Sequence, residues 1–412
     1  MKPIGPLPPP FAGQSGPLTI AGRPYTHWLE QAGDTPAFVY DVDAIAARIV
    51  RFRAAMPATV GLHYAVKANP FPPLLAAIAP LVDGLDVASA GELATVLPLA
   101  RPISFAGPGK RDDELAAAIA AGVTINLESS GEAARALAIG DRTGITPRLA
   151  VRVNPDLELR GSGMRMGGRA SPFGIDADRA AAVVRTVIAG GAEWRGFHIF
   201  AGSQSLDTAA LIEMQAATID LAARLADEAG APPPLVNLGG GFGVPYFAGD
   251  RPVDVEAIGA ALGEALERRA AVLASSRFAL ELGRWLVAEA GVYLTRVVDR
   301  KESRGETFVV VDGGLHHQLA ASGNFGTVVR RNYPVAVAGR MGGAADDLVS
   351  VVGCLCTPLD RLADRVMLPR AEVGDVVAVF LAGAYGLTAS PAGFLGHPAP
   401  AEVLAQWPAT GS

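Results

Sequence analysis

The stretch LHYAVKAN, residues 62–69, places a lysine at the end of an apolar run with the composition of a β-strand. A lysine buried among branched and aromatic neighbours loses hydration worth several kcal/mol unless another group uses its nitrogen. Lysine is also scarce, because Lys2, Lys67, Lys110 and Lys301 are the only four in a chain rich in arginine. The position favours a chemical role for Lys67, although a salt bridge alone would also use its charge.

Similar apolar runs recur along the first two thirds of the chain. The strand candidates are LHYAVK (62–67), LDVAS (85–89), ISFAG (103–107), TINLE (124–128), LAVRV (149–153), GFHIFA (196–201), VNLGG (236–240) and FALELG (278–283). Helix-periodic segments such as ELAAAIAAG, which a glycine closes, lie between them. Eight strand–helix units in about 225 residues predict an α/β fold of the (β/α)₈ barrel type. A doubly wound parallel sheet is the alternative, but it rarely needs eight units.

The predicted secondary structure changes after the last of these runs. GVYLTRVVDRK, TFVVVDGG, DDLVSVVGCLC and DVVAVFLAGAY are β-rich and separated by turns. We therefore expect a barrel over residues 42–287 and a mainly β domain over residues 288–412. Residues 1–41 precede the first barrel strand and are expected to add strands to the β domain.

Composition excludes several classes of protein. The net charge is −6 without any basic block, so we expect no nucleic-acid partner. No charge-free apolar run is long enough to span a bilayer, and the Pro-rich start lacks a signal-peptide core, so a cytoplasmic protein without membrane contact is expected. Cys354 and Cys356 lie too close together for an ordinary disulfide framework, and we predict no metal site because no His or Cys lies at a supporting spacing.

Polar and glycine residues gather where the predicted strands end. Strand one ends in Lys67, strand five in Arg152 and Asn154, strand six in Phe200, Gly202 and Ser203, strand seven in GGGFG (239–243) and strand eight in Glu281 and Arg284. Each has a simpler reading as a turn or a salt bridge. Together, at the barrel end where catalytic groups converge, a lysine, a phosphate cradle and a carboxylate predict a site for pyridoxal phosphate.

A series of motifs then carries a family resemblance. The motifs are YAVKAN, LDVASAGEL, RVNP, GSQ, NLGGGFG, ELGR, GCLCTPLD and GAY, in order between residues 38 and 395. They resemble those of the fold-type III pyridoxal-phosphate decarboxylases, which include the diaminopimelate, ornithine and arginine decarboxylases. ISFAGPGKRD and FHIFAGSQ are similar to the exosortase-associated members. Decarboxylases of carrier-protein-bound glutamate are a related comparison.

The resemblance implies a role for each matching residue. Lys67 matches the lysine that holds the cofactor, Glu281 the carboxylate that pairs with the pyridine nitrogen, and Cys356 the cysteine that a partner subunit contributes to protonate the carbanion. The implied cofactor contacts are Lys67, Asp86, Arg152, Phe200, Ser203, Gly239, Gly240, Gly241, Glu281, Gly283, Arg284 and Tyr385, and the candidate substrate contacts are His316, His317, Thr357 and Asp360. A homodimer with shared active sites follows from the role of Cys356.

The sequence departs from the family pattern at three places. Phe200 stands where a histidine usually stacks on the cofactor ring. Thr357 replaces an acidic residue, which removes a charge-assisted hydrogen bond worth roughly 1.5–3 kcal/mol to a distal ammonium. Ala320 stands where the diaminopimelate enzymes carry an arginine, and His316 and His317 beside it either contact a polar substrate or cap a loop.

These observations predict decarboxylation of an L-α-amino acid, or of an amino-acid conjugate such as a carrier-bound one, to the amine and CO₂. A diaminopimelate or other standard amino-acid decarboxylase is one alternative. A racemase on the same scaffold is a second, disfavoured because the carboxylate of Glu281 keeps the pyridinium protonated. A non-catalytic, decarboxylase-like regulatory binder is the third.

Overall fold

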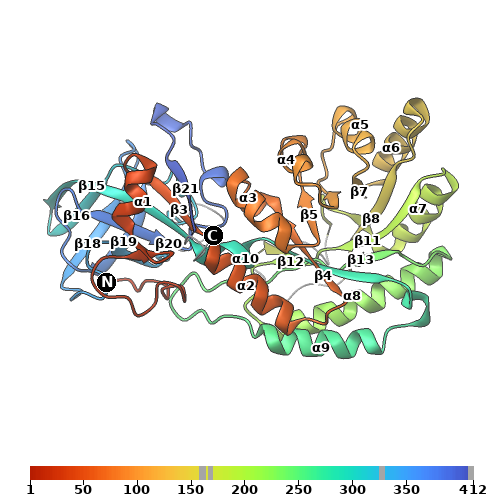
Figure 1. Ribbon diagram of the computed structural model, residues 1–412, viewed down its shortest axis with the longest axis horizontal. Helices are drawn as coiled ribbons and strands as arrows, with labels where there is room; N and C mark the ends of the chain where they lie inside the picture. The colour runs from red at the N-terminus through yellow and green to blue at the C-terminus, as the bar shows by residue number, and fades with distance from the viewer. Residues whose placement is uncertain (157–163, 166–169, 324–329, 407–412) are drawn as a thin grey trace, which may run out of the picture.

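Eight parallel strands close into a barrel in one of the two lobes of the computed structural model, which describes residues 1–156, 164–165, 170–323 and 330–406 (Figure 1). The strands are β4 (Val60–Ala65), β5 (Gly84–Val87), β6 (Ile103–Phe105), β7 (Thr124–Leu127), β8 (Arg148–Asn154), β11 (Glu193–Ile199), β13 (Leu235–Asn237) and β14 (Arg277–Leu282). Strand β14 pairs with β4, and β7 pairs with β8, so every barrel strand has two neighbours. The predicted (β/α)₈ barrel is confirmed.

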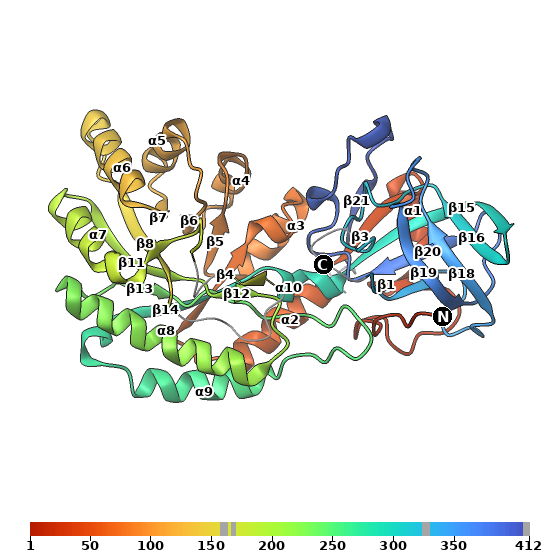
Figure 2. The same ribbon diagram turned by 180° about the vertical axis from the view of Figure 1, so that it is seen from behind.

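Helices alternate with these strands and cover the outside of the barrel (Figures 1 and 2). They are α2 (Val42–Ala55), α3 (Pro72–Ile78), α4 (Ala90–Val96), α5 (Asp112–Ala120), α6 (Ser130–Thr143), α7 (Ala177–Ala189), α8 (Thr208–Ala229), α9 (Val255–Glu267) and α10 (Arg284–Val287). The short strands β9 (Met164–Arg165), β10 (Ile175–Asp176) and β12 (Gly202–Ser203) lie in loops of the barrel. None of the described helices is both long and apolar enough to cross a membrane.

Two strand-to-helix turns use the same sequence device. Ser89 caps α4 by accepting a hydrogen bond from the backbone N–H of Glu92, at 3.2 Å. The Glu92 carboxylate accepts in return from the N–H of Ala88, and Ser129 and Glu132 repeat the arrangement at the start of α6. This is a variant of the capping box, in which the glutamate accepts from the residue before the N-cap instead of from the N-cap residue itself. The repeated S-x-G-E pattern thus sets where both helices begin.

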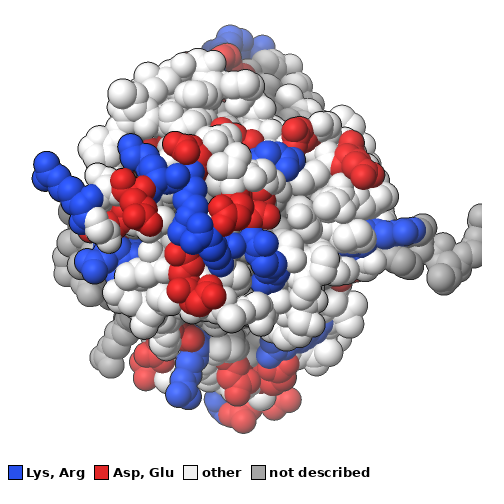
Figure 3. Space-filling model, turned by 90° about the vertical axis from the view of Figure 1, so that its left-hand side faces the viewer, with Lys and Arg blue, Asp and Glu red and all other residues white. Residues whose placement is uncertain are grey.

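The second lobe is a mainly β domain to which both ends of the chain contribute. Its strands are β3 (Ala37–Asp41), β15 (Gly291–Ser303), β16 (Glu306–Val311), β17 (Val335–Val337), β18 (Asp347–Val352), β19 (Arg361–Leu368), β20 (Val376–Phe380) and β21 (Ala401–Ala405). The long strand β15 pairs with β3, β20 and β16, while β21 pairs in parallel with β3. The small β1 (Thr19–Ile20), β2 (Arg23–Pro24) and α1 (Tyr25–Ala32) pack nearby. Basic and acidic side chains intermix on the outer end of this lobe (Figure 3).

Three local details differ from the sequence prediction. Lys67 lies in a 3₁₀ turn (Val66–Ala68) after β4, because the strand ends at Ala65. The helix-periodic segment AGELATVLPLA (90–100) predicts a longer helix, but α4 ends at Val96 because Pro98 lacks the N–H that would continue the α-helical hydrogen bonds. Strand β19 was not predicted, because its alternation of buried and exposed side chains breaks at Arg365. This residue has a positive φ of 52° and lies at a register shift against β18.

The contact between α2 and α9 gives a matched pair of glycine tests. A Cβ at Gly259 would lie 2.0 Å from the Ala55 carbonyl oxygen, whereas a Cβ at Gly263, one turn along the same helix, first meets Pro57 Cγ at 3.6 Å. We expect Gly259→Ala to destabilise the fold by about 1–3 kcal/mol through overpacking. Gly263→Ala should stabilise it by up to about 1 kcal/mol through helix propensity. Thermal unfolding of the two variants measures both effects, and equal shifts would contradict the close approach of α2 and α9.

Candidate active site

A cavity at the carboxyl ends of the barrel strands gathers most of the predicted cofactor residues. Those lining it include Lys67, Phe200, Ser203, Gly241, Glu281, Gly283, Arg284 and Tyr385. Glu281 lies at the end of β14, the others come from the segments after β4, β11, β13 and β14, and Tyr385 comes from the β domain. The carboxyl end is where barrel enzymes place their chemistry. The fold therefore brings together residues that lie more than three hundred positions apart.

The side chain of Lys67 opens into this cavity. The sequence had suggested instead that this side chain is buried. Its backbone neighbours Val66 and Ala68 are buried, but its side chain is 49% exposed. The Nζ atom lies 3.8 Å from Glu281 Oε1 and 5.8 Å from the centre of the Phe200 ring. Desolvation is the largest single influence and lowers the pKa of Lys67, yet the acidic groups around it, chiefly Glu281, together raise the pKa above the usual range. An accessible amine next to a carboxylate results.

Glu281 is the buried charge of the site, with only 7% of its surface exposed. Its Oε2 atom accepts a hydrogen bond from His198 Nε2 at 2.9 Å. Burial would raise the pKa of this carboxyl, but the His198 hydrogen bond and the charge of Lys67 lower it well below its usual value. Glu281 is therefore ionised at neutral pH.

The turn after β13 has the geometry of an anion cradle. Gly239 and Gly241 have positive φ values of 69° and 85°, which favour glycine. At Gly240, a Cβ would lie 2.0 Å from the carbonyl oxygen of Glu281, so no larger residue fits. The Asn237 side chain holds the turn by accepting from the Gly239 N–H at 2.9 Å. Backbone N–H groups can approach a phosphate closely at such a turn.

Arg284 lies beside this turn and has an N–H donor that no described residue accepts. Its Nη1 donates to the Tyr246 hydroxyl at 3.0 Å, and its guanidinium stacks 4.5 Å from the centre of the Tyr385 ring. Its Nε atom is buried and has no hydrogen-bond partner among the described residues. A buried N–H without a partner is costly, so this group is suited to an anionic ligand.

The β domain is tied directly to the lysine turn. The Tyr385 backbone N–H donates to the Ala68 carbonyl at 2.8 Å. The Asn69 side chain donates to the Gly383 carbonyl at 3.0 Å. These bonds fix Tyr385 against the segment that carries Lys67, so the two lobes build one cavity.

Two of the predicted cofactor residues lie inside the barrel next to, but not in, the lining of this cavity. Asp86 on β5 accepts from the Ser104 hydroxyl and lies 3.4 Å from His63 Nδ1. Arg152 on β8 donates to Glu128 Oε1 at 2.6 Å. Gly239 and Gly240 belong to the turn described above. For these four residues, as for those that line the cavity, direct contact with a cofactor stays a prediction.

Cys356 and the predicted substrate residues lie in the β domain, away from the Lys67 cavity of the same chain. Cys356 is exposed, whereas His316, His317 and Asp360 are buried. Asp360 accepts from the N–H groups of Leu315 and Leu355, at 2.7 and 2.9 Å. Burial lowers the pKa of His316 and of His317 to about 4, so both rings are neutral at pH 7.

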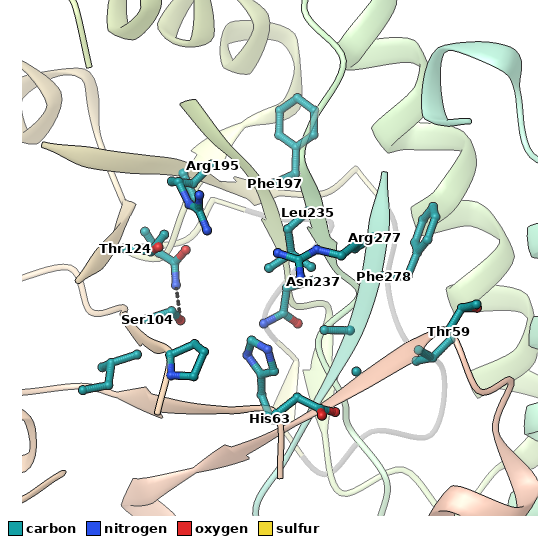
Figure 4. A pocket seen from close by; sticks show the side chains of 18 of the residues that line it. Thr59, His63, Ser104, Thr124, Arg195, Phe197, Leu235, Asn237, Arg277 and Phe278 are labelled. Atoms are coloured by element: carbon teal, nitrogen blue, oxygen red, sulfur yellow. Dashed lines mark hydrogen bonds between the residues drawn. The ribbon is translucent and has the colours of Figure 1, made fainter. Parts of the chain in front are cut away.

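A larger cavity of about 310 Å³ occupies the opposite end of the barrel (Figure 4). It is lined by residues at the starts of strands, such as Val60, Ile103, Thr124 and Arg277. His63 and Asn237 point toward one another there (Figure 4). No lysine lines this cavity within the described chain, and the amino ends of barrel strands serve stability. We therefore assign the chemistry to the smaller cavity around Lys67.

Sequence reasoning left His198, Tyr246 and His397 without a role. His198 had a usable signal, because a histidine two positions before Phe200 on a strand lies on the same face of the sheet. Tyr246, the partner of Arg284, lies in an irregular loop and had no such signal. His397 lies near Cys354 only through the fold, and it shows that the sequence-spacing argument against a metal site was incomplete.

A barrel with a lysine amine, a buried carboxylate and an anion cradle around one cavity defines the class of enzymes that bind pyridoxal phosphate through lysine. The residues fit that cofactor in three respects. The Lys67 amine is open to the cavity, and the glycine turn leaves no room for side chains. The Arg284 Nε atom has no hydrogen-bond partner among the described residues, so it can donate to an anion.

Comparison with known proteins is consistent with this class. The family described as pyridoxal-dependent decarboxylase, pyridoxal binding domain, matches residues 42–288. The chain belongs to this family, so it is a pyridoxal-phosphate-dependent carboxy-lyase that acts on an amino-acid-type substrate. The predicted activity and cofactor are confirmed, and the racemase and binder alternatives are set aside.

Relatives cover nearly the whole chain. An L-glutamyl-[BtrI acyl-carrier protein] decarboxylase from Niallia circulans is 37% identical over 91% of this chain and 90% of its own. A diaminopimelate decarboxylase from Archaeoglobus fulgidus is 32% identical over 96% and 93%. The crystal structure of diaminopimelate decarboxylase from M. jannaschii with L-lysine superposes with a TM-score of 0.86, at 25% identity and 98% and 93% coverage.

The hydrogen bond between His198 and Glu281 makes a prediction about pH. The folded-state pKa of Glu281 lies below its unfolded value of about 4.3, so ionised Glu281 stabilises the fold above that pH and ceases to do so as the pH falls. His198→Phe removes the hydrogen bond and raises this pKa. We therefore expect the thermal midpoint of the variant to lie below that of the wild type at neutral pH and to fall less than that of the wild type as the pH is lowered, because the gap between the folded and unfolded pKa values of Glu281 narrows.

The measurement is thermal unfolding of the cofactor-free protein from neutral pH down to about pH 3. His27→Phe, on the surface helix α1, controls for loss of a histidine elsewhere and should follow the wild type. Superimposable pH profiles for His198→Phe and wild type would show that the hydrogen bond does not hold the charge of Glu281.

Proposed function

We propose that this decarboxylase acts on an amino acid whose distal end is joined to a larger group, such as an acyl-carrier protein. The observation that carries the proposal is the absence of a formal charge at Thr357 and Ala320, where the diaminopimelate enzymes place an acid and an arginine. An acyl linkage leaves the distal end of the amino acid neutral, so it needs neither counter-charge. The similarity to the carrier-protein glutamyl decarboxylase supports the same reading.

The environment of Thr357 agrees with a neutral partner. Thr357 is half-buried, and its hydroxyl accepts from the Leu359 N–H at 3.3 Å. Its proton is therefore still available to donate to an acceptor such as an amide or thioester carbonyl. Free diaminopimelate would instead have to bring a charged distal group to this position.

The residues around the cavity divide the chemical tasks. Lys67 would hold pyridoxal phosphate through its amine, and Arg284 with the glycine turn would hold the phosphate. When bound, the cofactor supplies the electron sink for the electron pair left on Cα after CO₂ departs. Ionised Glu281 would keep the pyridine nitrogen protonated, and His198 would keep Glu281 ionised and oriented. Phe200 would pack on the ring face without handling a proton.

We place Cys356 in the active site of a partner subunit within a homodimer. Cys356 is exposed on the β domain and does not line the Lys67 cavity of its own chain. An exposed thiol within GCLCTPLD is available to a neighbouring chain. In the dimer it would deliver a proton to Cα of the product.

Substrate preference tests the proposal most directly. CO₂ release is measured with free L-glutamate, L-ornithine, L-lysine and meso-diaminopimelate, and with glutamate acylated at its side-chain carboxyl onto a pantetheine analogue. We expect kcat/KM for the acylated substrate to exceed that for each free amino acid by at least about a hundredfold, or roughly 2.7 kcal/mol of transition-state binding. Efficient decarboxylation of diaminopimelate would overturn the assignment and favour the standard decarboxylase.

Mixing two inactive variants tests the shared site. Lys67→Ala should lose the pyridoxal absorption band, and Cys356→Ser should retain it while decarboxylating slowly. If each site takes Lys67 from one chain and Cys356 from the other, a mixed dimer carries one intact site. Co-refolding equal amounts should then restore about a quarter of wild-type activity, since half the dimers are mixed and each has one working site of two. No recovery, with mixed dimers shown by mass spectrometry, would place both residues in one chain.

A further inference from the structure

Three loops of the β domain bring together side chains of the kind that bind zinc. His316 follows β16, Cys354 follows β18, and His397 precedes β21. Their ligand atoms all lie within 4.8 Å of one another. Cys354 Sγ is 3.8 Å from His397 Nδ1 and 3.9 Å from its Nε2. A zinc ion about 2.3 Å from sulfur and about 2.0 Å from nitrogen fits between atoms at this separation.

His316 is the strongest sign that this cluster is built for a ligand. Its side chain has 0% exposed surface, yet neither ring nitrogen has a hydrogen-bond partner anywhere in the described part of the chain. Its ring lies 5.2 Å from the ring of His397, between centres. A buried imidazole with two unused nitrogens loses its hydration without compensation, and a metal ion would restore that loss.

Neighbouring residues hold the three loops in place. One carboxylate oxygen of Asp360 accepts from the N–H of Leu315, next to His316, and the other accepts from the N–H of Leu355, next to Cys354. Gly314 and Gly353 leave space for this carboxylate, since a Cβ at either would lie 2.2 Å from one of its oxygens. One buried side chain thus fixes both loops.

His317 fixes the third loop. The Tyr293 hydroxyl donates to its Nδ1 at 3.0 Å, and its Nε2 donates to the carbonyl of Pro398 at 3.1 Å, next to His397. Both ring nitrogens of His317 are therefore occupied within the chain. The adjacent histidines have separate tasks, one positioning a loop and the other facing the cluster.

We propose that His316, Cys354 and His397 form a binding site for Zn²⁺ or a similar thiophilic divalent cation. Thiolate and imidazole ligands select such ions over Mg²⁺ and Ca²⁺. The Cys354 thiol, which now donates to the Asp312 carbonyl at 3.4 Å, would release its proton to solvent and coordinate as the thiolate. Three protein ligands leave the fourth tetrahedral position to water or to another oxygen ligand. The ion would cross-link three loops of the β domain.

The test uses the full-length, cofactor-loaded protein after dialysis against a chelator. Zinc is added, unbound metal is removed by desalting, and elemental analysis should find about one zinc ion per chain. Cobalt in place of zinc should give the intense visible ligand-field bands of a tetrahedral site and a thiolate charge-transfer band. Zinc should also raise the thermal midpoint of the wild-type protein, because the ion binds only the folded state.

Variants identify the ligands. Cys354→Ser and His316→Ala should lose the metal and the response of the thermal midpoint, while the pyridoxal absorption band checks that each variant is folded. Cys356→Ser is the matched control, since it removes an exposed thiol two residues away and should leave zinc content unchanged. Asp360 holds the loops of His316 and Cys354 in place without binding the ion itself, so Asp360→Asn should weaken zinc affinity by about tenfold to a hundredfold.

The proposal fails if the wild-type protein retains no zinc, or if cobalt gives no thiolate band. It also fails if Cys354→Ser retains the metal, or if Cys356→Ser loses it. Cys354→Ser is close in size to the wild-type residue, so it decides the outcome even if His316→Ala does not fold.

Discussion

The interaction on which the active site depends is the buried charge of Glu281. A carboxylate removed from water costs several kcal/mol unless it is paired, and here His198 donates to it at 2.9 Å while Lys67 lies 3.8 Å away. These groups come from three different strands or strand ends, β4, β11 and β14. These strands lie in one consecutive run of the sheet, β11-β13-β14-β4, and the curvature of the barrel directs their inward-facing side chains to one point.

The fold and the centre of the site were predictable because each depends on local sequence. Eight short apolar runs at regular spacing predict eight barrel strands, and Lys67, Glu281 and Arg284 follow such runs directly. Barrel geometry then places strand ends together without any knowledge of side-chain contacts. The glycine turn was predictable for the same reason, since positive φ values favour glycine.

What the sequence did not predict depends on contacts between distant segments. Cys354 and His397 are separated by 43 positions and meet only because β16, β18 and β21 assemble the same domain. The occupied oxygens of Asp360 and nitrogens of His317 likewise follow from backbone groups of other loops. The accessibility of Lys67 was also missed, because an apolar run shows that a strand is buried but not that a cavity opens where it ends.

The pairing of β21 with β3 has a consequence for the order of events during synthesis. Strand β3, which precedes the barrel in the sequence, lies beside β21, which follows it, so the whole barrel is inserted within the β domain (Figure 1). On the ribosome, all eight barrel strands are available once residue 282 has emerged. Strand β3 can pair with β15 only after β15 has also emerged, and β21 begins only at residue 401. The edges of β3 therefore stay unpaired while the barrel strands are made, and Tyr385 can complete the cavity only after all eight of those strands have been synthesised.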